Sequence, residues 1–380
     1  MMNNIKHHSV PKRLIAALGG LAMMVSLAAC GDNVDPTDSS GARDGNVSGL
    51  SGEFHGAGAS SQQGAVEAWI ATFQKKNRKA RIAYNPSGSG AGVTTFLTGA
   101  IAWAGTDAPL TDEQVEASKS VCKTGTAFEV PVYISPIAVF FNLKGISGPD
   151  KHLNMDASTV ARVFSGSITK WNDQAIVEQN PKVSLPDLPI TVVHRSDKSG
   201  TTNNFTSYLK AAAPEQWPHD PQENWPNDVG QAAKGNSGVV SSVGQADGTI
   251  GYADNSKVIA YGTVAVKVGN GYVAPSQDGA TKTVSASPAA KHVAKGSGRV
   301  VLDVDYATKE TGSYPVVSVS YAVACRAYKD AQTGLFMRSW LGYMVGADGQ
   351  QVAADNTGSA RFTGDLADRA AKSVANIDVE

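Results

Sequence analysis

Three segments of this chain repeat one pattern: a short apolar run, a turn rich in glycine and serine, and then apolar residues at helical spacing. The three turns are centred on Ser60, Ser89 and Ser199. Strands and helices that alternate in this way predict an α/β fold in which most strands are parallel. In such sheets, ligands bind beyond the carboxyl ends of the strands, where helices begin.

The turn around Ser199 combines a fixed cation with the start of a helix. Arg195 ends a predicted strand, and Ser199, Gly200 and Thr201 lead into a predicted helix over 202–210. The first turn of a helix has N–H groups without internal partners and carries partial positive charge, which suits a small anion. The alternative interpretation is a helix N-cap beside an unrelated surface arginine.

The other two turns offer similar donors. Ser60 and Ser61 open a predicted helix, and Ser60 with Gln63 has the spacing of a capping box. The turn at Ser89 has neither the Gly-Lys dipeptide of a P-loop nor the full G-x-G-x-x-G spacing, so a nucleotide is not indicated. If the three turns converge, their donors can surround one tetrahedral oxyanion.

An acidic residue, Asp107, follows the short strand predicted over 101–104. The alternative interpretation is that Asp107 only stabilises a turn through its own backbone. The chain has 33 basic and 34 acidic residues, and this nearly balanced charge argues against a nucleic-acid partner. Its 42% hydrophobic content is enough for a globular core.

Residues 1–30 have the three parts of an export signal: a basic start, an apolar stretch over 14–27, and small residues before Cys30. The Leu-Ala-Ala-Cys ending resembles a bacterial lipoprotein signal, in which the cysteine is lipidated and becomes the mature N-terminus. The alternative is an ordinary cleaved signal with a chance cysteine. Residues 31–46 are polar and without periodicity, which predicts a flexible tether.

Two further cysteines, Cys122 and Cys325, are expected to form one disulfide outside the cytoplasm; the alternative is two buried free thiols. The bond would close a loop of about 200 residues, worth roughly 5 kcal/mol in the chain-entropy model. The chain has no C-x-x-C motif, so neither a zinc site nor redox chemistry is indicated.

Two long apolar runs, 128–142 and 314–325, predict buried strands. Residues 211–229 contain Trp217, Trp225 and four prolines, and they predict an irregular excursion whose tryptophans anchor the loop rather than stack on a ligand. Residues 261–275 predict a hairpin with its turn at Gly-Asn-Gly.

The chain resembles the phosphate-binding component of the bacterial high-affinity phosphate ABC transporter. The resemblance covers roughly residues 50–345, and its most specific part is the Arg-x-Asp-x-Ser-Gly-Thr segment at 195–201. The matching segments are GAGASS at 56–61, SGSGAG at 87–92, AGTDAPLT at 104–111, ITKWND at 168–173, VVHRSDKSGTTNNFTSYL at 192–209, and KGNSGV with DGTIGY within 234–252.

The resemblance implies an α/β periplasmic-binding-protein-like fold of type II, with two lobes, mixed sheets flanked by helices and a two-strand hinge. Residues 47–134 with 318–380 are expected to form lobe I, and residues 135–317 to form lobe II. The two apolar runs would then be the strands that cross between the lobes.

The resemblance also implies a phosphate site, with Asp197 orienting the guanidinium of Arg195. Ser61 stands where the family often has an aromatic residue that contributes its backbone N–H. Serine keeps this N–H, but it lacks the aromatic ring that would cover the anion. The residues expected to contact phosphate are Ser60, Ser61, Ser89 and Asp107 from one lobe, and Arg195, Ser199, Gly200 and Thr201 from the other.

Selectivity is expected to come from Asp107. A carboxylate only accepts hydrogen bonds, and phosphate near neutral pH still carries a proton, whereas sulfate does not. Asp107 would therefore accept a hydrogen bond from phosphate and repel sulfate. With sulfate bound, the buried carboxylate would face an anion without a proton between them, which costs several kcal/mol.

The expected function is extracytoplasmic phosphate binding and delivery to an ABC permease, by a lipid-anchored monomer with no cofactor or metal. The rival interpretations are a secreted phosphatase or serine hydrolase, a binder of sulfate or molybdate, and an adhesive or structural lipoprotein. The chain has no G-x-S-x-G motif, and His194 precedes Arg195 on a strand and so should face away from the site.

Overall fold

A computed structural model describes residues 49–379 of the chain. The predicted export signal, the predicted lipidation site at Cys30 and the predicted tether over 31–46 all lie outside the described residues. Within 49–379, no helix has both the length and the apolar character needed to cross a membrane.

The strands form a mixed sheet in which eight strands follow the order β2-β1-β3-β11-β4-β8-β6-β7, while β5 and β10 join through β9. The strands are β1 (Gly52–Gly58), β2 (Ala80–Asn85), β3 (Trp103–Thr106), β4 (Thr124–Asn142), β5 (His152–Met155), β6 (Thr191–Arg195), β7 (Gln231–Ala233), β8 (Thr249–Asp254), β9 (Gly262–Val268), β10 (Gly271–Val273) and β11 (Val317–Ala327).

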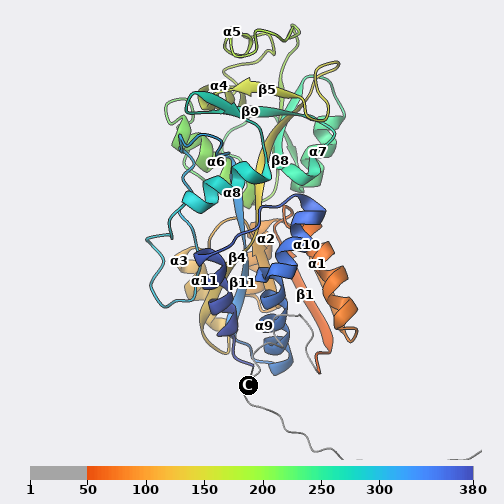
Figure 1. The fold of residues 1–380 in the computed structure, drawn as a ribbon, viewed down its shortest axis with the longest axis vertical. Helices are drawn as coiled ribbons and strands as arrows, with labels where there is room; N and C mark the ends of the chain where they lie inside the picture. The colour runs from red at the N-terminus through yellow and green to blue at the C-terminus, as the bar shows by residue number, and fades with distance from the viewer. Residues whose placement is uncertain (1–48, 380) are drawn as a thin grey trace, which may run out of the picture. The chain divides into compact units, whose positions relative to one another are not determined.

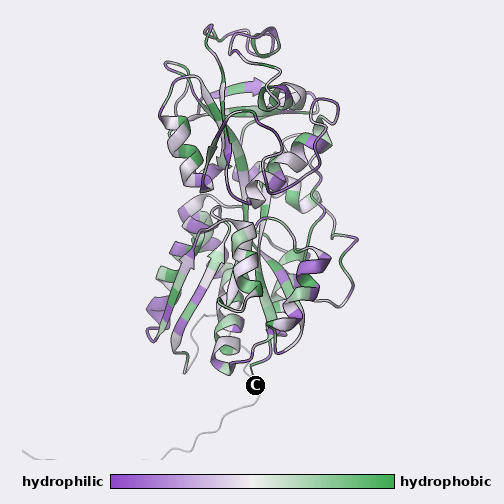
Figure 2. Cartoon of the chain, turned by 180° about the vertical axis from the view of Figure 1, so that it is seen from behind, coloured by the Kyte–Doolittle hydropathy of each residue, from purple (hydrophilic) through white to green (hydrophobic). Residues whose placement is uncertain are grey.

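The long strand β4 belongs to both halves of the sheet. It pairs with β11 from Thr124 to Pro136 and with β8 from Ile137 to Asn142 (Figure 1). Its β-branched and aromatic residues are buried on both faces, and hydrophobic residues gather along these central strands (Figure 2). Because β4 and β11 run in opposite directions, the middle of the sheet is antiparallel, and the prediction of mainly parallel strands is wrong there.

Helices flank the sheet throughout. They are α1 (Gln63–Lys76), α2 (Ser89–Leu97), α3 (Asp112–Ala117), α4 (Ala157–Phe164), α5 (Gln174–Val177), α6 (Gly200–Ala212), α7 (Gly235–Gly244), α8 (Gln277–Ala286), α9 (Ala331–Val345), α10 (Ala347–Thr357) and α11 (Asp365–Ala375), with short 3-10 turns at Ser118–Ser120 and Asn255–Lys257. The predicted hairpin at 261–275 is present as β9 and β10.

The capping box predicted at Ser60 and Gln63 is wrong. Helix α1 has Gln62 at its N-cap without a side-chain hydrogen bond, and the Ser60 hydroxyl bonds elsewhere. A true capping box lies at Thr111 and Gln114, at the start of α3.

The buried apolar side chains form two large clusters, which define two halves of the fold. The first half packs around Trp69, Trp103 and Trp340, and the second around Trp171 and Phe205. The stretch over 280–302, which the lobe boundaries place in lobe II, contributes buried side chains to the first cluster, among them Ala280, Val284, Ala290, Val300 and Val301.

Cys122 and Cys325 form a disulfide, which confirms the predicted pairing. Cys325 lies in β11, and Cys122 lies just before β4, so the bond joins two neighbouring strands across 203 positions of sequence. Both cysteines are buried.

Candidate anion-binding site

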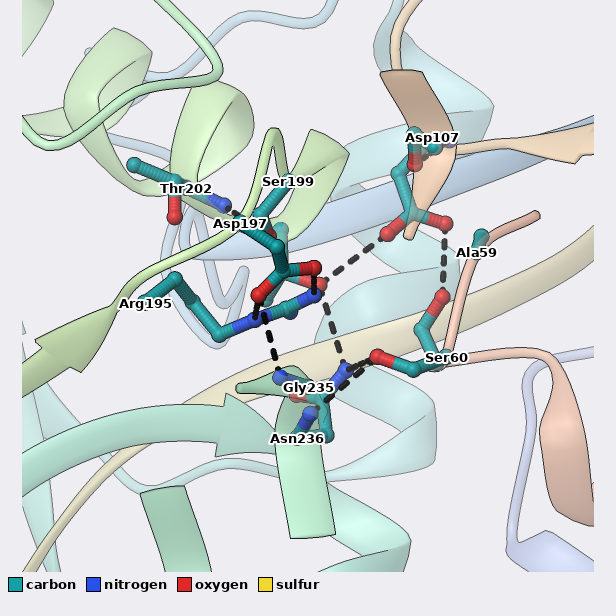
Figure 3. Close-up of polar contacts among 12 residues, drawn as sticks. Ala59, Ser60, Asp107, Arg195, Asp197, Ser199, Thr202, Gly235 and Asn236 are labelled. Atoms are coloured by element: carbon teal, nitrogen blue, oxygen red, sulfur yellow. Dashed lines mark hydrogen bonds and ion pairs between the residues drawn. The ribbon is translucent and has the colours of Figure 1, made fainter. Parts of the chain in front are cut away.

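Arg195 is buried at the carboxyl end of β6, with only part of its guanidinium paired. Its Nε donates to Oδ1 of Asp197 at 2.8 Å, and its Nη2 donates to Oδ2 at 2.6 Å (Figure 3). Nη1 is buried and has no hydrogen-bond partner among the described residues. A buried cationic donor without an acceptor is costly, so a ligand that supplies an acceptor to this nitrogen would be favoured.

Asp197 fixes the orientation of that guanidinium. Its Oδ1 also accepts from the N–H of Gly235, the first residue of α7, at 3.0 Å. Burial works to raise the pKa of Asp197, but the hydrogen bonds and charge of Arg195 and the Gly235 N–H outweigh it, so the pKa is lowered. The carboxylate therefore stays ionised and holds β6 against the start of α7.

Asp107 follows β3 and is buried among hydroxyl groups. Its Oδ1 accepts from Ser61 Oγ at 2.6 Å and from Ser320 Oγ at 2.5 Å, and its Oδ2 accepts from Thr201 Oγ1 at 3.0 Å. Ionised carboxylate oxygens offer about four acceptor positions in all, so one position remains on Oδ2. Ser320, on β11, was not predicted as a site residue because it lies inside an apolar run without a turn signal.

Ser89 and Gly200 both lie against Asp107 and close to each other. The Asp107 N–H donates to Ser89 Oγ at 3.2 Å. A Cβ added at Gly200 would stand 2.6 Å from both the Asp107 Cβ and the Ser89 Oγ. The start of α2 and the start of α6 thus meet at Asp107.

Ser199 is the N-cap of α6, with its Oγ accepting from the N–H of Thr202 at 3.1 Å. This is the N-cap of the alternative interpretation, but Arg195 beside it is buried rather than on the surface. The N-cap of that alternative is therefore present, but its surface arginine is not.

Asn236 connects the remaining serine to the site. Its backbone N–H and its Nδ2 donate to Ser60 Oγ at 3.1 and 3.0 Å, and Nδ2 also lies 3.4 Å from Thr201 Oγ1. Asn236 was missed as a site residue. It stands in the KGNSGV segment, but nothing in that segment distinguishes an amide that faces the site from one at a helix start.

Asp254, at the end of β8, supports Asn236 from behind. Its N–H donates to Asn236 Oδ1 at 2.9 Å, and its carboxylate accepts from Tyr133 Oη and from the N–H and hydroxyl of Ser256. Burial raises the pKa of Asp254 to about 6, even though the hydrogen bonds to its carboxylate act to lower it. Tyr133 belongs to β4, so this cluster joins the long strand to the site.

The segment over 213–230, between α6 and β7, corresponds to the excursion predicted over 211–229 and returns to the site through Glu223, which was also missed. The Glu223 carbonyl accepts from the N–H of Ser199 at 3.0 Å. Burial raises the pKa of its carboxyl, Asp107 and Asp197 raise it further, and Lys198 and Arg195 oppose them. Glu223 is therefore a third carboxyl group near the site.

His194 lies away from these groups, as the strand alternation predicted, and its ring stacks on Trp225 with centroids 5.1 Å apart. Trp217 is fully buried in the second cluster, which confirms that this tryptophan anchors the excursion. Within residues 49–379, no group of three or more His, Cys, Asp and Glu side chains could hold a metal ion.

Similarity to known protein families shows which family the chain belongs to. Residues 37–348 match the model of the PBP superfamily domain. The chain is 34% identical over 342 residues to phosphate-binding protein PstS 2 of Mycobacterium tuberculosis, covering 88% of this chain and 90% of the relative. It is also 34% identical over 350 residues to phosphate-binding protein PstS 3 of Mycobacterium leprae, covering 90% and 92%. The chain belongs to the PBP superfamily and, within it, to the family of PstS phosphate-binding proteins.

Solved structures share the fold. One is a high-affinity periplasmic phosphate-binding protein (PfluDING) bound with phosphate, with a TM-score of 0.67, 20% identity, and coverage of 83% of this chain and 92% of that one. Another is a phosphate ABC transporter substrate-binding protein with bound phosphate from Clostridium perfringens, with a TM-score of 0.58, 20% identity, and coverage of 82% and 100%. These confirm the periplasmic-binding-protein-like fold expected from the sequence.

Proposed function

We propose that this protein binds inorganic phosphate outside the cytoplasm and delivers it to the permease of a phosphate ABC transporter. The observation that carries the proposal is Arg195, whose buried Nη1 has no hydrogen-bond acceptor among residues 49–379. Membership of a family of transport proteins favours binding over the alternative of a phosphatase or serine hydrolase.

The proposed phosphate contacts come from four elements. The start of α6 supplies Ser199, Gly200 and Thr201, β6 supplies Arg195, the start of α2 supplies Ser89, and the segment between β1 and α1 supplies Ser60 and Ser61. Because the Ser61 hydroxyl already donates to Asp107, Ser61 is left with its backbone N–H for the anion. The family's aromatic residue at this place is expected to donate its backbone N–H to phosphate in the same way.

Asp107 is proposed to select phosphate by accepting a hydrogen bond from its proton. Three hydroxyl donors occupy its carboxylate and leave one acceptor position, on Oδ2. A protonated phosphate oxygen can donate to that position, whereas sulfate would place a lone pair against it. Sulfate and molybdate remain the chemical alternatives, and the direct test is discrimination between the three anions.

The lobe boundaries at 134, 135, 317 and 318 remain a proposal, with β4 and β11 as the two crossing strands. The stretch over 280–302 is then a part of lobe II that packs on the core of lobe I.

We further propose that Cys30 carries lipid, that residues 31–46 tether the folded part to the membrane, and that the protein acts as a monomer.

The experiment is calorimetric titration of the mature protein after removal of endogenous ligand. We expect tight 1:1 binding of phosphate and much weaker binding of sulfate and molybdate. Equal affinity for the three anions would remove the role of Asp107. Hydrolysis of p-nitrophenyl phosphate that is lost on Ser89→Ala would replace the transport function with an enzymatic one.

A further inference from the structure

The start of α2 lies directly on the backbone that follows Arg195. The N–H of Gly90 donates to the carbonyl of Lys198 at 3.3 Å. Helix α2 has Gly88 at its N-cap, with no side-chain hydrogen bond. A main-chain carbonyl from the second half of the fold therefore satisfies one of the unpaired N–H groups at the start of this helix in the first half.

This contact depends on glycine at position 90. A Cβ built at Gly90 would stand 2.5 Å from the Cβ and 3.0 Å from the Cδ of Lys198, and 3.2 Å from Glu223 Oε2. Real Cβ atoms do not approach other heavy atoms to 2.5 Å, so alanine at this position would push the two segments apart. Gly90 has an ordinary helical backbone, with no positive φ that would itself require glycine.

Two further glycines make contacts of the same kind. A Cβ at Gly88 would overlap Asp197 Oδ2 and stand 3.0 Å from the Lys198 carbonyl. A Cβ at Gly200 would meet Asp107 Cβ and Ser89 Oγ at 2.6 Å. Gly88 and Gly90 lie at the start of α2, and Gly200 at the start of α6. We call these three residues the glycine seam.

We propose that Gly90 is a positioning residue of the anion site: the absence of its side chain lets the start of α2 pack on Lys198 and close the site around the anion. The proposal rests on the proposed phosphate-binding function. Its physical basis is that an anion held by both halves is bound tightly only where their donors reach it together.

Gly90 is the right member of the seam to test. Gly88 has a φ of 101°, so alanine there would be strained whatever surrounds it. Gly200 would donate its own N–H to phosphate, so its replacement would mix two effects. Gly90→Ala changes only the approach of the two segments, and alanine suits a helix better than glycine does.

The first measurement compares phosphate binding by Gly90→Ala and by Gly342→Ala. Gly342 also lies within a helix, α9, and the nearest atom to a Cβ there is 4.0 Å away. We expect Gly90→Ala to bind phosphate about tenfold to a hundredfold more weakly, as overpacking of a close contact predicts, and Gly342→Ala to bind like the wild type.

A matched pair of second-site changes separates the steric cause from general damage. Lys198→Gly removes the Cβ that the added methyl group would strike, whereas Lys198→Ala keeps it; both remove the same charge. In the Lys198→Gly background, Gly90→Ala should weaken binding less than about threefold, whereas in the Lys198→Ala background it should still cost about tenfold or more.

Each outcome decides a separate point. If the wild type does not bind phosphate, the proposed function fails, whatever the variants do. If the wild type binds and Gly90→Ala binds equally well, Gly90 has no positioning role. An equal loss from Gly90→Ala in both Lys198 backgrounds would also overturn the proposal, because the contact with the Lys198 side chain would then not be the cause.

Discussion

Asn236 donates from its side-chain amide to Ser60 Oγ at 3.0 Å, a contact between residues 176 positions apart in the chain. The same amide accepts from the Asp254 N–H through Oδ1, so its orientation is set from behind. Asn236 thus holds one of the proposed phosphate-binding hydroxyls and links it to the second half of the fold.

Asn236→Ala should weaken phosphate binding by about tenfold, because it removes hydrogen bonds worth roughly 1 kcal/mol each and leaves the Asp254 N–H without its acceptor. Titration calorimetry measures the change. Ser237→Ala, at the exposed neighbouring position of α7, should have no effect. Equal binding by the two variants would show that Asn236 is only a structural residue of α7.

Arg195→Lys should weaken phosphate binding by about tenfold to a hundredfold. A lysine ammonium cannot donate twice to Asp197 and still present a separate nitrogen to the anion, as Nη1 does, and one hydrogen bond to a charged group contributes roughly 1.5–3 kcal/mol. Arg162→Lys on α4 is the control. Wild-type affinity in Arg195→Lys would remove the guanidinium from the site.

Asp107→Asn should lower the preference for phosphate over sulfate by about tenfold or more, because it removes the charge that repels an anion without a proton. Competition between the two anions measures the ratio. Asp112→Asn, at an exposed position of α3, serves as the control. An unchanged ratio in Asp107→Asn would mean that selectivity arises elsewhere.

Asp254 should give stability a distinctive pH dependence. Burial raises its pKa from the usual 3.8 to about 6, so between these two pH values the folded state binds more protons than the unfolded chain does. Its contribution to the free energy of unfolding must then fall as pH rises through this window, by up to about 1.4 kcal/mol per pH unit.

Urea unfolding between pH 4 and 7 tests this. Asp254→Asn should lack this component, so its stability relative to the wild type should increase as pH rises from 4 to 6. Asp355→Asn, at an exposed position of α10, should follow the wild type at every pH. Parallel curves for the wild type and Asp254→Asn would show that Asp254 does not titrate in this range.

Replacing Cys122 and Cys325 together by serine should lower the free energy of unfolding by several kcal/mol, with about 5 kcal/mol from the entropy of the long loop. Denaturant unfolding without reductant measures the loss. Phosphate affinity should change little, since neither cysteine contacts the site residues. An unchanged free energy of unfolding would show that the unfolded chain is already restricted by other means.

Local signals predicted the elements that supply the site. The glycine- and serine-rich turns mark the starts of α2 and α6, and the apolar run over 128–142 predicts β4. Helices α8 and α10 were not predicted, because tertiary packing rather than a strong local pattern supports them. The capping box at Ser60 failed for a related reason: the hydroxyl found a more distant partner in Asn236.

The sequence by itself determined the strand–turn–helix units, the arginine at the end of β6, the acidic residue after β3 and the residues of the disulfide, because each depends on residue type and local spacing. Only the tertiary structure decided that Asn236, Ser320 and Glu223 join the site and that Gly90 lies on Lys198. These contacts link positions far apart in the chain, and only the packing of the two halves determines which of many similar polar or small residues meet.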